Sequence, residues 1–426
     1  MNMISKVAVI GLGYIGLPTA AILATNGIRV VGVDVNQETV DSVNRGEVPF
    51  VEPDLRVHVS GAVAQGNLSA STETPAADVF IVAVPTPFND DKSADLSYIE
   101  SAARNIAPKL AGGELIILES TSPPGATIHL GEYLIALRPD LSLNGESGRP
   151  QILVAHCPER VLPGRVMIEL VTNDRIIGGI TREAAEKSKV LYEVFCKGEI
   201  HLTDATTAEM SKLVENSYRD VNIAFANELS MVSKRLGVDI WELISLANHH
   251  PRVNILSPGP GVGGHCIAVD PWFVIDAAPD LTNLMRAARQ VNDGMPFHVV
   301  EEVTQAVLRV DNPIVAFLGL SYKANIDDLR QSPAVDIVKR YAQNNLSVDI
   351  RLVEKHIDNI PQVLRVHPNI RHQELDGALA DANVVVLLVD HSEFTEVSLS
   401  SLVGKKVIDT RGVWLTSREL RFERVI

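Results

Sequence analysis

The sequence predicts an α/β protein in which two doubly wound domains are joined by a long central helix. In the first half, short β-branched runs alternate with segments that carry apolar residues at helical spacing, which is the pattern of a parallel sheet covered by helices. More than thirty residues, from Thr203 to Leu236, contain neither proline nor glycine, as one continuous helix requires. A second alternating region begins near Ile314. The expected domains are residues 1–202, 203–310 and 311–426.

The individual elements follow from the same periodicities. The strands expected in the first domain are Val7–Ile10, Val30–Asp34, Val79–Val84, Leu115–Glu119 and Ile152–His156. The central helix is expected to begin at a Thr203 or Asp204 cap and to end at Gly237, and shorter helices are expected within 241–254 and 283–296. Four further strands are expected within 314–324, 347–354, 384–390 and 405–412, and they make a smaller second α/β domain.

Composition limits the class of protein. Of the 426 residues, 46% are hydrophobic and 21% are charged, which is ordinary for a soluble globular chain. The formal charge of −15 argues against nucleic acid or an anionic membrane as a partner. The three cysteines, Cys157, Cys196 and Cys266, form no CxxC pair, so reduced thiols in the cytoplasm are expected rather than a disulfide framework or a zinc site.

The uncharged segment 7–24 has the composition of a signal peptide or a short membrane helix. Three glycines and Pro18 within it disfavour both a signal peptide and a membrane helix. The next residues resume as a strand, as they would in a βαβ unit. We therefore expect no membrane span.

A glycine-rich fingerprint follows the first strand and opens a helix. Gly11 allows the tight turn, Gly13 allows close approach of a pyrophosphate, and Gly16 lets the helix pack on the strand. Asp34 ends the next strand, 18 residues after Gly16. A carboxylate there binds a ribose 2′-hydroxyl and repels a 2′-phosphate, which favours NAD over NADP. The first domain is thus predicted to be a Rossmann domain.

Three more segments follow strands of that domain, at the carboxyl ends where ligands of open α/β sheets collect. VPTPF (84–88) and ESTSPPGAT (119–127) offer Thr86, Thr121 and Thr127 to a cofactor cleft, although ordinary proline-rich turns explain the same residues. In CPERVLPG (157–164), Glu159 can act as a base and Arg160 can bind an anion. A surface ion pair explains these two equally well.

The long helix carries Lys212, Asn216 and Arg219 at positions i, i+4 and i+7, so the three share one face. A solvated polar stripe is the ordinary explanation of such a face. The alternative is that Lys212 and Asn216 hold one substrate oxygen and stabilise an oxyanion.

The loop GPGVGGHCIAVDP (259–271) contains Cys266, for which three interpretations are open. A metal site is disfavoured because His265 and Cys266 are adjacent and no second cysteine lies nearby. A buried structural thiol remains possible. A nucleophile needs cationic neighbours, and Lys212, Arg252 and His265 can supply them, while Asp270 can order a water molecule.

The segment GLSYKANIDDLRQSP (319–333) follows the first strand of the second domain. It lacks the GxGxxG fingerprint, so this domain is predicted to be Rossmann-like without being a second site of the same kind. Tyr322 can stack on a base, and Lys323 and Arg330 can meet phosphates. A basic, exposed helix entry is the alternative.

Taken in order, these segments resemble the UDP-glucose/GDP-mannose dehydrogenase family over essentially the whole chain. The resemblance rests on GLGYIGLP, VPTP, ESTSPPG, CPERVLPG, AEMSKLVENSYRDVNIAFANEL, GPGVGGHCIAVDP and FLGLSYKANIDDLRQSP. PERVLPG and NHHPRVNILSPGPGVGGHCIAVDPWF are most similar to the branch that acts on UDP-N-acetyl-D-mannosamine. The glucose branch has a second glutamate where this chain has Pro163, so no role for that glutamate carries over.

The resemblance implies a four-electron oxidation of the sugar C6 alcohol to a carboxylate with two NAD⁺, for the synthesis of cell-surface polysaccharides. It implies that the Cys266 thiolate traps the aldehyde as a thiohemiacetal, which becomes a thioester and is hydrolysed. Lys212 and Asn216 match the oxyanion-holding positions, and Asp270 and Glu159 match those that order water or move protons.

The resemblance also implies binding residues and a partner. NAD contacts fall on Tyr14, Ile15, Asp34, Thr86, Thr127 and Arg330. UDP-sugar contacts fall on Arg160, Val161, Lys212, Asn216, Arg219, His250, Arg252, Gly263, Tyr322, Lys323 and Arg411, and Gly261, Gly263 and Gly264 are expected to press against the hexose. The family forms homodimers through the central helix, so Arg252 is expected to act in the partner's site.

Three alternatives remain at the level of sequence. UDP-N-acetylglucosamine or UDP-glucose can replace UDP-N-acetyl-D-mannosamine, because a few contacts decide the choice of sugar. A two-electron β-hydroxyacid dehydrogenase would share the Rossmann domain, long helix and Lys–Asn pair, but it needs neither Cys266 nor the domain with Tyr322 and Arg330. A silent NAD-binding regulator would not need Cys266, Lys212, Asn216 and Asp270 together.

Overall fold

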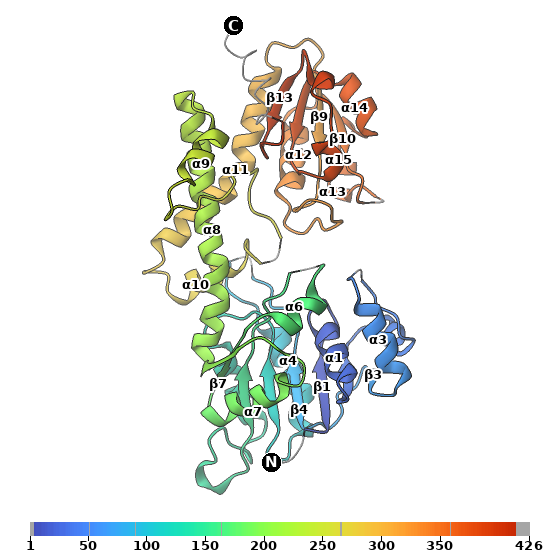
Figure 1. Ribbon diagram of the computed structural model, residues 1–426, viewed down its shortest axis with the longest axis vertical. Helices are drawn as coiled ribbons and strands as arrows, with labels where there is room; N and C mark the ends of the chain where they lie inside the picture. Colours follow the sequence, from blue (N-terminus) through green and yellow to red (C-terminus); the bar gives the residue numbers. More distant parts are fainter. Residues whose placement is uncertain are drawn as a thin grey trace. The chain divides into compact units, whose positions relative to one another are not determined.

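The computed structural model describes residues 4–50, 52–89, 91–162, 164–264, 266–357 and 359–414. Pro163 and His265, both named above, lie outside these residues. The chain divides into two compact units (Figure 1). The first is Met1–Glu215 with Trp272–Pro279, and the second is Asn216–Pro271 with Asp280–Ile426. The long helix α8 (Ala205–Leu236) contributes residues to both.

The first unit is built on an eight-stranded sheet, which confirms the predicted fold class. The strand order is β3-β2-β1-β4-β5-β6-β7-β8, and every neighbouring pair is parallel except β6 with β7. The strands are β1 (Lys6–Ile10), β2 (Arg29–Val33), β3 (Leu68–Ser71), β4 (Val79–Val82), β5 (Leu115–Leu118), β6 (Leu153–His156), β7 (Arg175–Gly179) and β8 (Ile200–Asp204).

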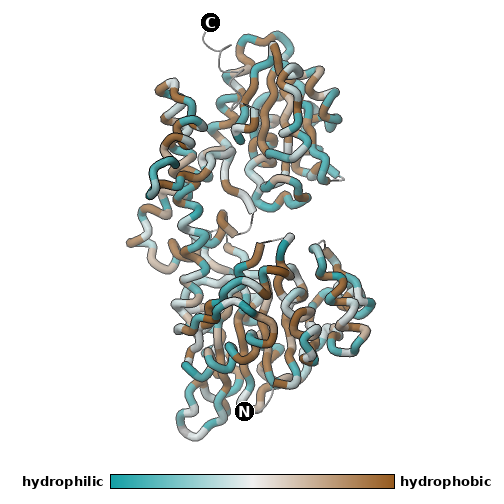
Figure 2. The backbone as a smooth tube through the Cα atoms, viewed as in Figure 1, coloured by the Kyte–Doolittle hydropathy of each residue, from teal (hydrophilic) through white to brown (hydrophobic). Residues whose placement is uncertain are grey.

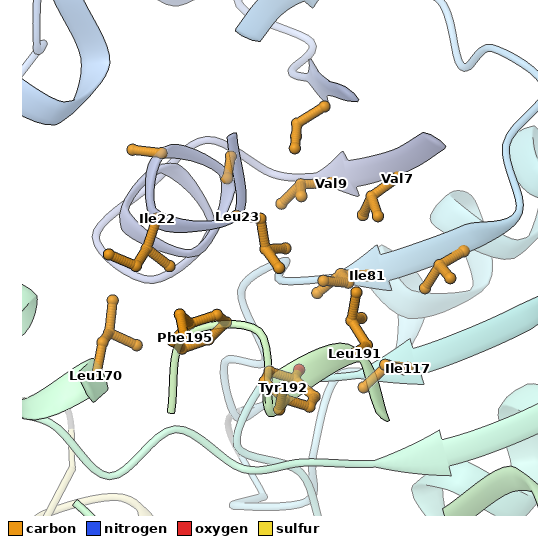
Figure 3. Packing of buried hydrophobic residues seen from close by; sticks show 14 of the residues in the cluster. Val7, Val9, Ile22, Leu23, Ile81, Ile117, Leu170, Leu191, Tyr192 and Phe195 are labelled. Carbon is orange, nitrogen blue, oxygen red and sulfur yellow. The ribbon is translucent and has the colours of Figure 1, made fainter. Parts of the chain in front are cut away.

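Helices cover both faces of this sheet, and for this reason its central strands are apolar at every position. The helices of the unit are α1 (Gly16–Thr25), α2 (Gln37–Asn44), α3 (Leu55–Ala64), α4 (Ser97–Ile106), α5 (Ala126–Leu137), α6 (Val166–Thr172), α7 (Arg182–Tyr192) and, from Trp272 onward, α10 (Asp270–Ala277). On one face, Val9 and Ile81 of the strands pack with Leu23 of α1 and Leu191 of α7 (Figure 3). Ile99 of α4 and Leu130 of α5 belong to the core on the other face.

Three strands of this sheet were not predicted from the sequence. β3 reads LSAS, β7 ends in two glycines, and β8 contains histidine, threonine and aspartate, so none has the β-branched alternation that marks a strand. Because β8 runs directly into α8, Thr203 lies in a strand rather than at a helix cap. The Asp204 carboxylate does cap the helix, since it accepts a hydrogen bond from the Thr207 amide at 2.9 Å.

The second unit contains a five-stranded, wholly parallel sheet in the order β11-β10-β9-β12-β13. Its apolar strands are drawn mostly brown in Figure 2. The strands are β9 (Ile314–Leu318), β10 (Asp349–Val353), β11 (Ile370–His372), β12 (Val384–Leu387) and β13 (Lys406–Asp409). The helices are α9 (Ile240–Ala247), α11 (Asn283–Val307), α12 (Pro333–Asn344), α13 (Gln362–Arg365), α14 (Leu375–Asp381) and α15 (Ser392–Thr395).

Two details of this unit differ from expectation. The three-residue strand β11 was not predicted, because IRH is too short to show a period. The helix expected within 283–296 continues through Pro296 to Val307. Proline removes one helical hydrogen bond, but the buried Val299, Val303 and Val307 continue the apolar face beyond it and hold the helix together. No helix in the described part of the chain is long and apolar enough to cross a membrane.

His156, the last residue of β6, gives the first unit an acid sensitivity. Its side chain is fully buried, and burial lowers the pKa of His156 to about 3 because the charged imidazole is poorly solvated there. An unfolded histidine titrates near 6.5. Between these two values the unfolded chain binds one more proton than the folded chain, so stability is present above pH 6.5 and is lost as the pH falls toward 3.

We expect this residue to lower the free energy of unfolding by about 2 kcal/mol between pH 7 and pH 5. His156→Leu should remove that part of the pH dependence, whereas the exposed His201 changed to Gln should leave it. Urea denaturation followed by circular dichroism at pH 5, 6 and 7 measures the effect. An unchanged slope in His156→Leu would contradict the assignment.

Candidate active site

The glycine-rich turn between β1 and α1 has the form that a dinucleotide phosphate site needs. Gly11 has a φ of 95°, and a Cβ atom there would collide with the Ala83 carbonyl. A Cβ atom at Gly16 would collide with the Gly11 carbonyl. At Gly13 no atom lies within 4 Å of the point that a Cβ atom would occupy. The protein itself therefore requires glycine at 11 and 16, whereas the backbone at Gly13 faces open space beside the N-terminus of α1, where an anion is stabilised.

Asp34 is fixed beside this turn. Its Oδ2 accepts a hydrogen bond from the Leu12 amide at 2.9 Å, and its Oδ1 accepts one from the Asn36 amide at 2.9 Å. Tyr14 is exposed, and its ring stacks on Phe50 with 4.2 Å between the centroids. Ile15, the residue before α1, is half-buried. The turn, the carboxylate and the exposed ring fit an NAD molecule laid across the carboxyl ends of β1 and β2.

The three predicted threonines differ in their surroundings. The Thr86 hydroxyl is buried and has no hydrogen-bond partner among the described residues, which suits a site completed by a ligand. Thr121 is half-buried. Thr127 is fully buried, and its hydroxyl donates to Glu209 of α8 at 2.6 Å. Glu209 also accepts the Gly125 amide, so it fixes the start of α5 to α8, and sequence reasoning missed it.

Glu159 belongs to a buried ionic cluster that no sequence motif indicates. Its Oε2 lies 3.4 Å from the Arg175 guanidinium of β7, and both side chains are less than 10% exposed. The guanidinium also lies over the ring of Tyr192, 4.7 Å from the centroid, and the Tyr192 hydroxyl donates to Glu119 at 3.1 Å. Burial and the neighbouring Glu159 raise the pKa of Glu119 far above its usual range, against the pull of Arg175.

Arg160, the next residue, pairs with a different acid. Its guanidinium forms a two-bonded ion pair with Glu215 of α8, with N···O distances of 2.5 and 3.2 Å. The neighbouring Val161 is half-buried. The predicted anion-binding arginine is thus held in place by a carboxylate.

On α8, Asn216 meets the predicted water-ordering residue. The Asn216 Nδ2 donates to Asp270 Oδ2 at 2.6 Å, and both side chains are buried. Lys212 lies one turn earlier and is half-buried, whereas Arg219 is exposed. Lys212, Glu159 and Arg160 belong to the first unit, and Asn216, Arg219 and Asp270 belong to the second.

Cys266 is exposed, whereas Cys157 and Cys196 are buried. The Cys266 carbonyl accepts hydrogen bonds from the amides of Val269 and Asp270, at 3.0 and 2.8 Å. These bonds place Cys266 one turn before α10, which begins at Asp270. The second unit therefore brings together an exposed thiol and the Asn216–Asp270 pair. No cluster of three metal-ligating side chains occurs among the described residues.

The glycines of the Cys266 loop pack against protein on the side where a Cβ atom would project. A Cβ at Gly263 would lie 2.7 Å from Tyr322 Cβ and 2.8 Å from the Gln331 carbonyl. A Cβ at Gly264, where φ is 81°, would lie 2.9 Å from the Tyr322 ring. From the sequence, these glycines are expected to press against the sugar. Their close packing on the 319–333 segment already accounts for the absence of side chains.

The start of this loop is held by a buried polar network that sequence reasoning also missed. The Gly259 amide donates to Asn227 Oδ1 of α8 at 2.8 Å. Asn227 then donates to Asn292 of α11, and Asn292 donates to Asp220 of α8. Arg289 closes the network with an ion pair to Asp220 at 2.6 Å. The four side chains are fully or almost fully buried, so the loop is tied to two long helices.

The remaining predicted contacts lie in the second unit. Arg330 forms a two-bonded ion pair with Asp328, and its carbonyl accepts the Gly264 amide at 3.1 Å. Tyr322 is half-buried and Lys323 is exposed. Arg411 pairs with Asp390 at 2.9 Å, and its guanidinium lies 2.8 Å from the point that a Cβ at Gly259 would occupy. His250 and Arg252 are exposed, and His250 Nδ1 accepts the Arg252 amide.

Comparison with known proteins agrees with this organisation. Three family models match the chain in order: the UDP-glucose/GDP-mannose dehydrogenase NAD binding domain at residues 5–196, central domain at 206–294 and UDP binding domain at 316–416. An NDP-N-acetyl-D-galactosaminuronic acid dehydrogenase of Ralstonia nicotianae is 56% identical over 97% of both chains. The UDP-N-acetyl-D-mannosamine dehydrogenase of Escherichia coli is 51% identical over 96% of this chain and 99% of its own.

A solved structure is also similar throughout. The UDP-N-acetyl-mannosamine dehydrogenase of Staphylococcus aureus is 42% identical, with a TM-score of 0.84 over 97% of this chain and 96% of its own.

The buried cluster around Arg175 generates a prediction. Arg175→Met leaves Glu119 and Glu159 buried without a cation, so we expect a loss of about 3–5 kcal/mol in the free energy of unfolding. Adding Glu159→Gln should recover part of that loss, because it removes the unpaired charge. The matched control is Arg182→Met, since Arg182 is 86% exposed in its ion pair with Glu186. Urea denaturation measures all three, and equal stability of Arg175→Met and the control would refute the assigned pairing.

Proposed function

The chain belongs to the UDP-glucose/GDP-mannose dehydrogenase family and is an NAD-dependent nucleotide-sugar dehydrogenase, and from this premise we propose that it oxidises C6 of UDP-N-acetyl-D-mannosamine to the carboxylate. The observation that carries the proposal is the exposed Cys266 thiol one turn before α10, with Asp270 of that helix bound to Asn216. Oxidation of an alcohol to a carbonyl needs no such nucleophile, whereas the proposed further oxidation to the carboxylate proceeds through a thioester and does.

Two NAD⁺ molecules, held in turn at the Gly11–Gly16 turn, would each accept one hydride. The first oxidation turns the C6 alcohol into an aldehyde. The Cys266 sulfur then adds to the aldehyde carbon, and the second loss of hydride converts the thiohemiacetal into a thioester. Water attacks the thioester carbon, the C–S bond breaks, and the thiolate is regenerated with the product carboxylate. Sulfur suits both roles because it is a strong nucleophile and a good leaving group.

Asn216 is suited to hold the developing oxyanion. Its amide carries two N–H bonds, and one of them donates to Asp270. That bond fixes the orientation of the amide. The second N–H can therefore donate to the oxyanion without further loss of entropy. In the proposal the Lys212 ammonium is the second donor. Asp270 and Glu159 order the hydrolytic water and accept its proton.

The choice of sugar within the family is the finer part of the proposal. Relatives named for UDP-N-acetyl-D-mannosamine and for NDP-N-acetyl-D-galactosaminuronic acid have similar sequence identities to this chain, 51% and 56%. UDP-N-acetylgalactosamine is therefore the second candidate substrate, ahead of UDP-N-acetylglucosamine and UDP-glucose. A two-electron hydroxyacid dehydrogenase is not supported, because it would leave the UDP binding domain at 316–416 without a role.

The proposal is tested by the yield of NADH per sugar with each of these four UDP-sugars. We expect two NADH per molecule of UDP-N-acetyl-D-mannosamine, and a kcat/KM at least about tenfold higher than for the other three, since a few lost polar contacts cost that much. A preference for UDP-N-acetylgalactosamine would move the proposal to the second candidate. One NADH per sugar would refute the four-electron mechanism.

Cys266→Ser provides the matched control for this experiment. The hydroxyl is a weaker nucleophile and a poorer leaving group, so turnover should be lost while the affinity for NAD⁺, measured by calorimetry, stays unchanged. Normal turnover of this variant would reduce Cys266 to a structural thiol.

The proposal includes a homodimer formed through α8. It also places the enzyme in the cytoplasm, where its product enters the synthesis of cell-surface polysaccharide. Support for the dimer comes from an exposed apolar stripe on α8. Tyr218, Phe225, Val232 and Leu236 are 46–70% exposed, and their spacings of seven, seven and four residues place them along one side of the helix. Arg252, which is exposed, is proposed to complete the partner's site.

A charge in the middle of this stripe should separate the subunits. We expect Phe225→Glu to shift sedimentation from the mass of a dimer to that of a monomer, because a carboxylate cannot be buried there without a partner. Val57→Glu is the matched control, since Val57 is a 73% exposed apolar residue of α3, away from the stripe. An unchanged dimer in Phe225→Glu, or a monomeric parent protein, would overturn this part of the proposal.

A further inference from the structure

A buried acid–histidine pair lies at the carboxyl edge of the second sheet. Glu354 directly follows β10, and His391 lies between β12 and α15. These strands flank β9 on its two sides. Glu354 is 2% exposed and His391 is fully buried. Neither residue belongs to the motifs from which the site was predicted.

Glu354 binds the backbone of the loop that follows β9. Its Oε2 accepts hydrogen bonds from the amides of Leu320 and Ser321, at 2.7 and 3.3 Å, and lies 3.2 Å from His391 Nε2. Its Oε1 accepts the His356 amide at 2.9 Å. Burial opposes ionisation, but the hydrogen bonds from His391 and from the backbone outweigh it and lower the pKa of Glu354 to about 2. The carboxylate is therefore charged at neutral pH.

His391 holds the other end of the same loop. Its Nδ1 accepts the Asn325 amide at 2.9 Å. Because an accepting nitrogen carries no proton, the proton of the neutral ring lies on Nε2 and is donated to Glu354. The Asn325 side chain also exchanges two hydrogen bonds with Ser392, at 2.9 and 3.0 Å. The pair thus fixes the 320–325 loop at both ends.

This loop presses on the segment that carries the thiol. The Tyr322 ring lies against Gly264, two residues before Cys266, so closely that a Cβ atom at Gly264 would be 2.9 Å from the ring. The Gly264 amide donates to the Arg330 carbonyl. Any movement of the 320–325 loop must therefore move the backbone at Gly264, because close-packed surfaces do not absorb displacements.

We propose that Glu354 and His391 are positioning residues, which hold the 320–325 loop against Gly264 and thereby set the place of the Cys266 thiol and of the Tyr322 and Lys323 side chains. The part that concerns catalysis rests on the proposed role of Cys266. The part that concerns the geometry of the thiol and the affinity for UDP does not.

Glu354→Gln is the first test, because it keeps the size of the side chain but puts one amide donor where only acceptors fit. Loss of a hydrogen bond to a charged group costs enough to change an equilibrium by about tenfold or more. We expect the alkylation rate of Cys266 by iodoacetamide to change at least about fivefold, the Kd for UDP to rise about tenfold, and kcat to fall at least about tenfold. The Kd for NAD⁺ should not change.

Glu374→Gln is the matched control, since Glu374 is exposed in the same domain and its substitution removes the same charge. Where Glu354→Gln does not fold, as judged by circular dichroism, His391→Asn tests the same pair, because the shorter amide reaches only one of the two partners. A folded variant with the parental alkylation rate and UDP affinity would overturn the proposal. If Cys266→Ser retains turnover while Glu354→Gln still alters alkylation, the catalytic role of Cys266 fails and the positioning role stands.

Discussion

The place of Cys266 depends on two glycines, whose lack of side chains lets Tyr322 and the Gln331 carbonyl pack directly on the backbone of the loop. Gly263 and Gly264 lie so close to Tyr322 and Gln331 that a single Cβ atom would force them apart. In the proposed mechanism the thiol adds to one carbon atom and leaves it again, which needs a position defined to a fraction of an ångström. Glycine on a free loop would give the opposite, because it has the largest conformational entropy of any residue. Here the loop loses that entropy because Gly263 and Gly264 pack on the 319–333 segment and because the Asn227–Gly259 hydrogen bond fixes the start of the loop.

Several groups that hold the site in place are buried charges or amides with distant partners. Arg175 supports Glu159, Arg289 and Asp220 support Asn292, and His391 supports Glu354. Such pairs add little to net stability, because desolvation offsets much of their attraction. They do exclude alternative arrangements, since a shifted partner would leave a buried charge unpaired. The same property makes the scaffold intolerant of the loss of one partner.

The fold class and the central strands could be predicted because a strand buried on both faces is apolar throughout, as in β4 and β5. β3, β7 and β8 were missed, since their polar residues or glycines interrupt the strand pattern and these strands are stabilised by pairing with a neighbour that the local sequence does not name. The same reason explains why some site residues could be predicted from the sequence and others could not. Cys266, Asn216 and Asp270 stand in recognisable motifs, whereas Arg175, Asn227 and His391 acquire a role only through partners 16, 32 and 37 residues away.

The two units use one local arrangement for two purposes. In each, a glycine with a φ above 90° begins the turn after the first strand, and an acid at the end of the next strand accepts the amide of the following leucine, Leu12 or Leu320. Asp34 uses two acceptor positions on the backbone and stays half-buried, so it keeps capacity for a ribose hydroxyl. Glu354 is fully engaged by three amides and His391, and Ser321 stands where the first turn has Gly13. The second acid therefore has nothing left for a dinucleotide, and its charge acts on the loop instead.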